Sequence, residues 1–308
     1  MRDALPEGCE LRDRGRHRLK DLRHSEHIFQ ALADGFPDVS MPPDTAEQLD
    51  THAHGDVEPA GLPTACPYRG LAAFREVDAP FFFGREAFTE LLLDAVAHGP
   101  MAGVVGPSGS GKSSVVFAGL VPRLRAAEGG AGWTVLELRP GARPFHALAG
   151  TLVPWYERTD LTETDRLAET GKLAGHLRGG TIAARDVLQR IGDKHAGLDR
   201  LLLVVDQFEE LYTLCSDDGE QRAFQDLLFS AAFERAGGVP LTLGLTLRAD
   251  FMGHALAYRP FADAIQRHDV KLGPMTRGEL ARAVRLPAEI QGRSFEPGLV
   301  ERIVDDVG

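Results

Sequence analysis

Cysteine, long hydrophobic runs and positive charge are all scarce in this 308-residue chain. Its three cysteines, Cys9, Cys66 and Cys215, are far apart and form no CxxC pair, so neither a disulfide framework nor a cysteine zinc site is expected. The most apolar run, LLLDAVAHGPMAGVVG, is interrupted by Asp94 and His98 well short of the length that crosses a bilayer. Together with a charged N-terminus, these features predict a cytoplasmic protein with no membrane partner.

Basic residues are outnumbered by acidic ones, 34 to 45, which gives a formal net charge of -11. Such a balance opposes sequence-independent binding of nucleic acid through bulk charge, so a nucleic-acid partner is not expected. The eleven histidines are scattered without HxH or HxxxH spacing and are interpreted as surface or core residues. With 43% hydrophobic and 26% charged residues, the composition is that of a globular protein.

The composition changes along the chain and predicts four regions. Residues 1–34 contain two candidate strands, CELRDRGRHRLKDL and EHIFQAL. Residues 35–65 are rich in proline, glycine, aspartate and histidine and are expected to be a linker. Residues 66–272 are expected to form an α/β core, and residues 273–308 are a final region that the family resemblance given below implies to be the start of a helical lid or winged-helix region. Because the final segment ends within an amphipathic helical pattern, the chain is expected to be a fragment of a longer one.

Helical patterns alternate with buried-strand patterns after residue 66. The predicted helices cover residues 86–99, 113–129 and 220–238, and the predicted strands cover residues 102–106, 133–140, 198–207 and 240–250. Alternation of this kind indicates βα units, and hence a mostly parallel sheet with helices on both faces.

The stretch GPSGSGKS fits the pattern G-x-x-x-x-G-K-[S/T] at every position and lies between a predicted strand and a predicted helix. Its glycines allow successive backbone N–H groups to surround a phosphate, and the following helix points its positive end at the same place. Lys112 can then reach the β- and γ-phosphates, and the Ser113 hydroxyl can bind Mg²⁺. The alternative is a flexible turn with an incidental lysine. The candidate phosphate-binding residues are Gly106, Pro107, Ser108, Gly109, Ser110, Gly111, Lys112, Ser113 and Ser114.

A phosphate loop of this type requires an acidic partner at the end of a second buried strand. Five apolar residues, Leu201 to Val205, predict that strand, and Asp206 follows at its carboxyl end, where it can hold Mg²⁺ opposite Ser113. Glu209 or Glu210 can orient or partly deprotonate an attacking water, and the pattern does not choose between them. The alternative for these two acids is a favourable interaction with a helix dipole.

Two further segments contribute candidate residues. The strand LTLGLTLRADF brings Arg248 to the edge where a γ-phosphate would lie, so Arg248 is a candidate sensor of that phosphate. Its alternative role is an ion pair with Asp250. In FFFGREAFTELL, an aromatic strand and a turn at Gly84 precede Arg85, which opens a helix expected to pack near the nucleotide.

Five ordered blocks of the sequence resemble the bacterial novel STAND NTPases, signal transduction ATPases with numerous domains, which are AAA/NACHT-like P-loop proteins. The blocks span residues 66–308 and are CPYRGLAAFREVDAPFFFGREAF, GPSGSGKSS, LLLVVDQFEELYT, LTLRADF and LGPMTRGELARAVRLPAEIQGRSFEPGLVERIVDDVG. The resemblance implies an ASCE-type P-loop core, ATP with Mg²⁺, slow hydrolysis and a nucleotide-controlled switch. It also implies that Asp206 binds Mg²⁺, that Arg248 is the sensor, and that Gly84 and Arg85 approach the base.

The first 34 residues resemble a different family. LPEGCELRDRGRHRLKDLRHSEHIFQAL, followed by PDVSMPPD, is similar to the tail of bacterial class III adenylate/guanylate cyclase domains. The acidic metal residues of such a domain lie upstream of its tail and are absent here, so no cyclase activity is expected. The alternative is an ordinary hairpin joined to the NTPase.

The leading hypothesis is therefore an ATP-binding, slowly hydrolysing STAND switch, whose nucleotide controls self-association and signals to sensor or effector domains outside this chain. One alternative is a scaffold that holds ATP or ADP without turnover; Gln207, directly after Asp206 where many relatives place an acid, favours it. A second alternative is a DNA-binding transcriptional regulator. The preference for ATP over GTP comes from the resemblance, because no base-reading NKxD-type segment is visible.

Overall fold

A computed structural model describes residues 9–17, 26–33, 66–126, 132–156, 162–195, 197–234 and 239–307. The chain divides into two units, residues 1–61 and residues 62–308. In the first unit, strands β1 (Cys9–His17) and β2 (Glu26–Ala33) form an antiparallel hairpin with a register shift between Asp13 and Gly15. Both strands predicted in this region are confirmed. The predicted linker lies outside the described residues.

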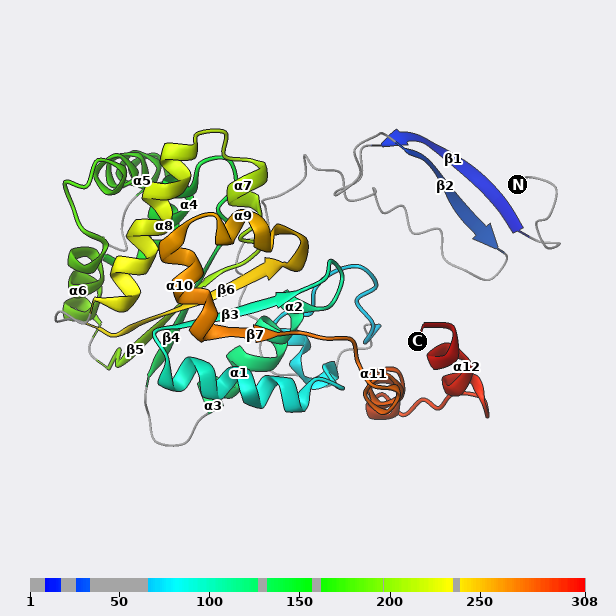
Figure 1. The fold of residues 1–308 in the computed structure, drawn as a ribbon. Helices are drawn as coiled ribbons and strands as arrows, with labels where there is room; N and C mark the ends of the chain where they lie inside the picture. Colours follow the sequence, from blue (N-terminus) through cyan, green and yellow to red (C-terminus); the bar gives the residue numbers. More distant parts are fainter. Residues whose placement is uncertain are drawn as a thin grey trace. The chain divides into compact units, whose positions relative to one another are not determined.

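The second unit is built on a five-stranded parallel sheet with the order β4-β5-β6-β3-β7. Strand β6 therefore lies between β3, which leads into the phosphate-loop sequence, and β5, which leads into Asp206. This arrangement, with helices on both faces (Figure 1), confirms the predicted α/β fold of ASCE type. The strands are β3 (Met101–Gly106), β4 (Trp133–Leu138), β5 (Arg200–Val205), β6 (Leu241–Arg248) and β7 (Asp269–Lys271).

The helices fall in the predicted segments and in several that the pattern did not assign, including α4, α5, α6 and α10. The aromatic strand predicted before Gly84 is wrong, because Glu76–Phe81 forms a 3₁₀ turn and no strand follows it up to Gly84. They are α1 (Glu86–His98), α2 (Lys112–Ser114), which continues through a π-helical stretch (Val115–Leu120) into α3 (Val121–Ala126), α4 (Pro144–Tyr156), α5 (Glu163–Arg178), α6 (Ala184–Lys194), α7 (Glu210–Thr213), α8 (Asp218–Phe233), α9 (Met252–Leu256), α10 (Arg259–His268), α11 (Arg277–Ile290) and α12 (Leu299–Val307), with 3₁₀ turns at Glu76–Phe81 and Ala249–Phe251. None of the described helices is long and apolar enough to cross a membrane.

The core consists of two apolar layers, one on each face of the sheet. Alternate residues of β5 point to opposite faces, so Leu201 and Leu203 join the layer under α4, α5, α6, α8 and α10, whereas Leu202 and Val204 join the layer under α1 and α3. Figure 1 shows α1 and α3 along one side of the sheet and α8 and α10 along the other. Burial on both faces explains why β5 is a continuous apolar run, and it fixes the position of the residue that follows the strand.

Helix α11 packs against the segment that leads into α1. A capping box formed by Thr276 and Glu279 begins α11. The backbone of Gly84 comes so close to the helix that an added Cβ would lie 2.5 Å from the carbonyl oxygen of Glu279. The Arg282 guanidinium, on the same helix, pairs with Glu86 at 2.9 Å. The start of α1 and the start of α11 therefore form one contact.

Gly84→Ala is expected to break this contact, because Gly84 has a φ of +86° and no room for a Cβ. The left-handed backbone costs roughly 1–2 kcal/mol for a residue with a side chain, and the overlap adds about 1–3 kcal/mol. Denaturant unfolding measures the sum. Gly70→Ala is the matched control, since Gly70 has a φ of +59° but nothing within 4 Å of its added Cβ. Equal destabilisation by the two variants would contradict the close contact.

Candidate nucleotide-binding site

The loop between β3 and α2 has the backbone that its glycines predict. Gly109 and Gly111 have φ values of +73° and +89°, in the left-handed region that favours glycine. An added Cβ on Gly106 would lie 2.8 Å from the Leu272 carbonyl oxygen and 2.9 Å from Ser110 Oγ. The loop ends at the beginning of α2, whose first amide groups have no acceptor within the helix. Such a loop is a natural anion-binding site.

The Lys112 side chain is hydrogen-bonded to the backbone of its own loop. Its Nζ donates hydrogen bonds to the carbonyl oxygens of Gly106, at 3.0 Å, and Pro107, at 2.7 Å. Burial lowers the pKa of the ammonium group, and the negative charge of Glu209 partly opposes this shift. A buried cation with only carbonyl partners would gain from a nearby anion, so the position of Lys112 fits phosphate binding.

Asp206 is the centre of a hydrogen-bond network that joins the loop to the sheet. The residue is fully buried. Its Oδ1 accepts hydrogen bonds from the hydroxyls of Ser113, at 2.6 Å, and Thr246, at 2.8 Å. Its Oδ2 accepts a hydrogen bond from Arg139 Nε at 3.2 Å, and Nη2 of the same guanidinium lies 3.1 Å from Oδ2 as an ion pair. The two residues predicted to hold a metal, Ser113 and Asp206, are therefore in direct contact.

The donor atoms present fit a polar ligand and a hard cation. A hydroxyl and a carboxylate are oxygen ligands of the kind that Mg²⁺ prefers. In the described part of the chain, two buried side-chain atoms lack a hydrogen-bond partner, Ser110 Oγ and Arg85 Nε. The two residues that carry these atoms are in contact, because Arg85 Nη2 donates a hydrogen bond to the Ser110 carbonyl oxygen at 3.3 Å. Unpaired buried polar atoms are costly, and here both lie at the phosphate-loop sequence.

The turn after Asp206 is strained. Gln207 has a φ of +55°, the one non-glycine residue with a positive φ among those described. Its N–H donates to Thr246 Oγ1 at 2.8 Å, and the next N–H, of Phe208, donates to the Thr246 carbonyl oxygen at 2.9 Å. Phe208 is fully buried. Strain of this kind persists only where surrounding contacts hold it, and here it turns Glu209 back toward the loop.

The two candidate acids lie in different surroundings. Glu209 is buried, and its Oε2 accepts a hydrogen bond from the Arg248 N–H at 3.3 Å. Glu210 is half-buried and begins α7. Burial raises the pKa of Glu209, although the Arg248 N–H and the Lys112 charge oppose the shift. The choice of the water-orienting residue stays a prediction, and the Glu209 carboxylate interacts electrostatically with Lys112.

Arg248 lies at the predicted edge, but its side chain is held by another acid. Its Nε and Nη2 donate to Asp250 at 3.1 and 2.8 Å, and its guanidinium lies 5.4 Å from the centre of the Phe251 ring. This is the ion pair considered as the alternative to a sensor. A sensor role for Arg248, which stays a prediction, would require this pair to open.

The remaining candidates surround the loop. Ser114 Oγ accepts a hydrogen bond from the Phe74 N–H at 3.1 Å, which ties α2 to the preceding segment. Ser108 is exposed. Gly84 and Arg85 are connected to the loop through Ser110, whereas the approach of a base to them stays a prediction.

Two residues of the network, Arg139 and Thr246, were missed by the sequence reasoning. A signal for Arg139 was present, because it directly follows β4 as Asp206 directly follows β5. The last residues of these strands, Leu138 and Val205, are register partners in the parallel sheet. The two polar residues beyond them are therefore neighbours. Thr246 carried no comparable signal, since it lies inside an apolar strand.

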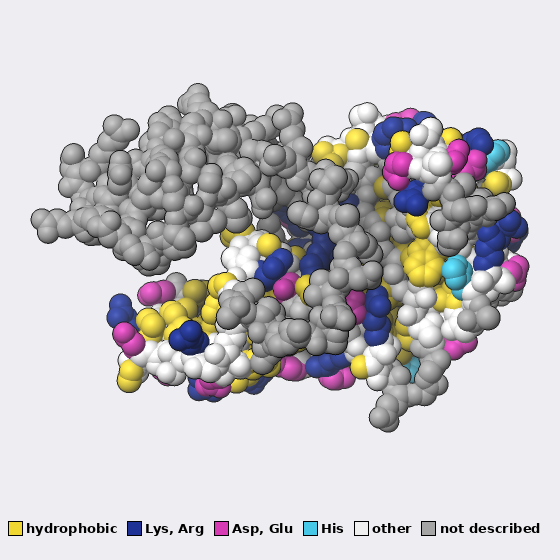
Figure 2. All heavy atoms as spheres, turned by 180° about the vertical axis from the view of Figure 1, so that it is seen from behind, with side chains coloured by type: hydrophobic (Ala, Val, Ile, Leu, Met, Phe, Trp, Pro, Cys, Tyr) yellow, Lys and Arg dark blue, Asp and Glu magenta, His cyan; other side chains and the backbone are white. Residues whose placement is uncertain are grey.

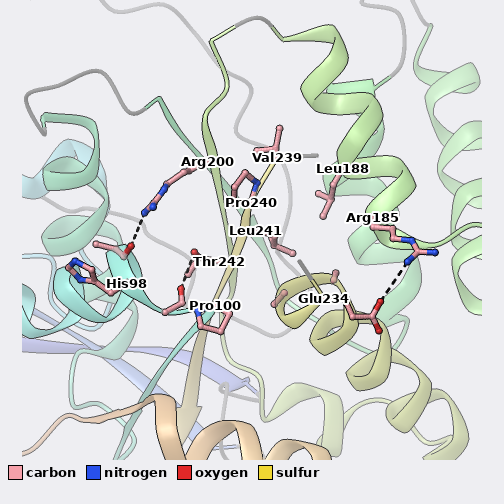
Figure 3. A pocket seen from close by; sticks show the side chains of 14 residues that line it. His98, Pro100, Arg185, Leu188, Arg200, Glu234, Val239, Pro240, Leu241 and Thr242 are labelled. Atoms are coloured by element: carbon pink, nitrogen blue, oxygen red, sulfur yellow. Dashed lines mark hydrogen bonds and ion pairs between the residues drawn. The ribbon is translucent and has the colours of Figure 1, made fainter. Parts of the chain in front are cut away.

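A cavity of about 340 Å³ lies elsewhere, at the amino ends of the strands. Figure 3 shows interactions of Arg200, of Thr242 and between Arg185 and Glu234. Arg200 donates to the Ala97 carbonyl oxygen at 2.7 Å, Thr242 donates to that of Gly99 at 3.3 Å, and Arg185 lies 3.8 Å from Glu234. The phosphate-loop sequence and Asp206 lie at the carboxyl ends, so this cavity is separate from the candidate nucleotide site.

The parallel sheet and the glycine-rich loop between β3 and α2 define a P-loop NTPase, a class of nucleotide-binding proteins. The chain belongs to the family Novel STAND NTPase 1, whose model matches residues 67–308. This confirms the family expected for this region. No curated protein matches the chain.

Solved structures of low identity also match. A Walker-type ATPase of Pyrococcus abyssi is 16% identical with a TM-score of 0.49, over 77% of this chain and 66% of that one. The ORC2 protein of Aeropyrum pernix in its ADP form is 16% identical with a TM-score of 0.48, over 72% and 56%. The ORC1 protein of Aeropyrum pernix in complex with DNA is 20% identical with a TM-score of 0.44, over 72% and 53%. The chain thus spans about half to two thirds of these structures.

The buried position of Glu209 predicts a pH-dependent stability. Its pKa is raised above the ordinary value of 4.5, so folding favours its protonated form. The contribution of protonated Glu209 to the stability of the folded protein is present below about pH 4.5 and is lost as the pH rises through the raised pKa. Glu209→Gln cannot ionise, so its melting temperature relative to the unmodified protein should be higher at pH 8 than at pH 4. Glu210→Gln is the control, and an equal trend in both variants would contradict the assignment.

Proposed function

We propose that the protein binds ATP together with Mg²⁺, hydrolyses it slowly, and acts as a nucleotide-dependent switch in signal transduction in the cytoplasm. The observation that carries the proposal is the direct hydrogen bond between Ser113 of the P-loop and the buried carboxylate of Asp206. It brings the two expected metal ligands together beside Lys112. The family membership and the resemblance to STAND proteins support the choice of ATP and the switch.

Each residue of the site has a role that its position supports. The loop amides and Lys112 would bind the phosphates, and Ser113 and Asp206 would hold Mg²⁺. Bound Mg²⁺ would supply charge neutralisation of the terminal phosphates. Glu209 or Glu210 would orient a water for attack, and burial raises the pKa of Glu209, which suits a carboxylate that takes up a proton.

A path from the nucleotide to the lid supports the switch. Arg85 contacts the loop at Ser110, and the adjacent Gly84 contacts the backbone of α11 at Glu279. A bound phosphate that moves the loop would therefore disturb the packing of α11 against Gly84. We assign residues 66–272 to the NTPase core and residues 273–308 to the start of the lid. Nucleotide-dependent self-association and coupling to domains outside this chain complete the proposal.

The hairpin of the first unit fits the second resemblance. Two antiparallel strands followed by a proline-rich segment agree with a cyclase-domain tail, so we propose residues 1–34 as such a tail and residues 35–65 as a linker. A tail of this kind lacks the metal-binding acids of its family and has no cyclase chemistry of its own.

A non-hydrolysing scaffold is the second candidate function. It is favoured by Gln207, which stands directly after Asp206 and is held in a strained turn. A DNA-binding regulator has less support, because basic and acidic side chains are interspersed on the face shown in Figure 2 and the net charge is -11.

Lys112→Ala should weaken nucleotide binding by more than about tenfold, because it removes the cation of the phosphate loop. Titration with a fluorescent ATP analogue measures the affinity. Lys172→Ala, which removes a lysine from the exposed surface of α5, should leave it unchanged. Unchanged affinity in Lys112→Ala would overturn the proposed phosphate site.

Turnover separates the switch from the scaffold. The unmodified protein should release phosphate from ATP slowly and only with Mg²⁺, and either Glu209→Gln or Glu210→Gln should slow release by about two orders of magnitude while ATP affinity stays within a few-fold. Phosphate release is followed under single-turnover conditions. Tight binding without any Mg²⁺-dependent release would favour the scaffold.

A further inference from the structure

Arg139 is placed at the candidate site by the register of the sheet. It follows β4 directly, beside the residue that follows β5, and the Asp206 N–H donates to the Leu138 carbonyl oxygen at 2.9 Å. The Arg139 guanidinium then reaches Oδ2 of Asp206, while Oδ1 of the same carboxylate accepts from Ser113. Arg139 and the Ser113 hydroxyl therefore contact the two oxygens of the same carboxylate.

The contact supplies a charge that Asp206 needs. A fully buried carboxylate is costly without a charged or strongly donating partner. Of the described side chains, Arg139 is the one cation within ion-pair distance of Asp206. Arg139 thus pairs with the carboxylate that is proposed to hold Mg²⁺.

The guanidinium also keeps donors for a second partner. An arginine has five N–H donors in a planar fork that matches carboxylates and phosphates. Within the described part of the chain, Arg139 uses only Nε and Nη2 in its contacts, both toward Oδ2, and its side chain is 25% exposed. Arg248 differs, since the same two nitrogens are held by Asp250 and the guanidinium lies over Phe251.

We propose that Arg139 is a nucleotide-sensing residue of this site. In the structure it pairs with Asp206. When Mg²⁺ and a nucleoside triphosphate are bound, the charge of Asp206 is matched by the metal, and the Arg139 fork donates to the terminal phosphate. A diphosphate lacks that acceptor, so Arg139 contributes to the preference for triphosphate. This inference rests on the proposed function, because it needs the nucleotide to bind at the P-loop.

The test compares ATP and ADP affinities by calorimetry, with Mg²⁺ present, for Arg139→Gln, Arg139→Lys and the unmodified protein. Arg139→Gln should weaken ATP binding about tenfold or more and change ADP binding by less than about threefold. Arg139→Lys keeps the charge without the fork and should fall between them. Arg143→Gln is the matched control, since it removes an exposed arginine from the same connection; it should change neither affinity.

Three results would overturn the inference. Equal weakening of ATP and ADP by Arg139→Gln would reduce Arg139 to a residue that only positions Asp206. Unchanged affinities for both ATP and ADP in both Arg139 variants would show that Arg139 takes no part in nucleotide binding. If Arg248→Ala loses the preference for ATP over ADP and Arg139→Gln keeps it, then Arg248 is the sensor and Arg139 is not. If Arg139→Gln fails to fold, the ratio of the ATP and ADP affinities of Arg139→Lys tests the inference instead.

The failure of this inference can be told apart from failure of the proposed function. An unmodified protein that binds neither nucleotide would overturn the P-loop proposal and this inference together. An unmodified protein that binds ATP, loses that binding in Lys112→Ala and keeps it in Arg139→Gln would overturn this inference alone.

Discussion

The structure of this site depends on one buried carboxylate. Asp206 accepts hydrogen bonds from Ser113 on the P-loop helix, Thr246 on β6 and Arg139 after β4, so it joins three parts of the sheet edge that are far apart in the chain. A charge in that position must be satisfied on every side. The same requirement fixes the orientation of the P-loop hydroxyl and suits the carboxylate to a metal ion.

Contacts extend from this centre toward the last helices. Ser110 of the loop is in contact with Arg85, and the neighbouring Gly84 is packed on the backbone of α11. The first contact is a hydrogen bond from the Arg85 side chain and the second is a close approach of two backbone segments, so a shift of the loop can reach α11 through Arg85 and Gly84. A bound triphosphate and a bound diphosphate can then favour different positions of α11, and a switch requires such a difference between two bound states.

The sequence predicts those parts of the site that depend on neighbouring residues. The P-loop and Asp206 could be predicted because a complete motif and a buried strand identify them locally. Arg139 and Thr246 could not be assigned in the same way, because their roles depend on which strands are neighbours and in what register. The contact of Gly84 with α11 joins residues nearly two hundred positions apart. Glu209 and Glu210 are adjacent in sequence, and only the strained Gln207 turn gives them different burial.

Hydrogen exchange tests the central claim most directly, since it observes the loop and the lid in one experiment. The unmodified protein is measured without nucleotide, with ADP, and with ATP and Mg²⁺ under conditions of slow turnover. The account predicts greater protection of residues 106–114 with either nucleotide, and a protection of residues 277–290 that differs between ADP and ATP. Equal exchange of residues 277–290 in all three states, with residues 106–114 protected, would contradict a nucleotide-controlled switch.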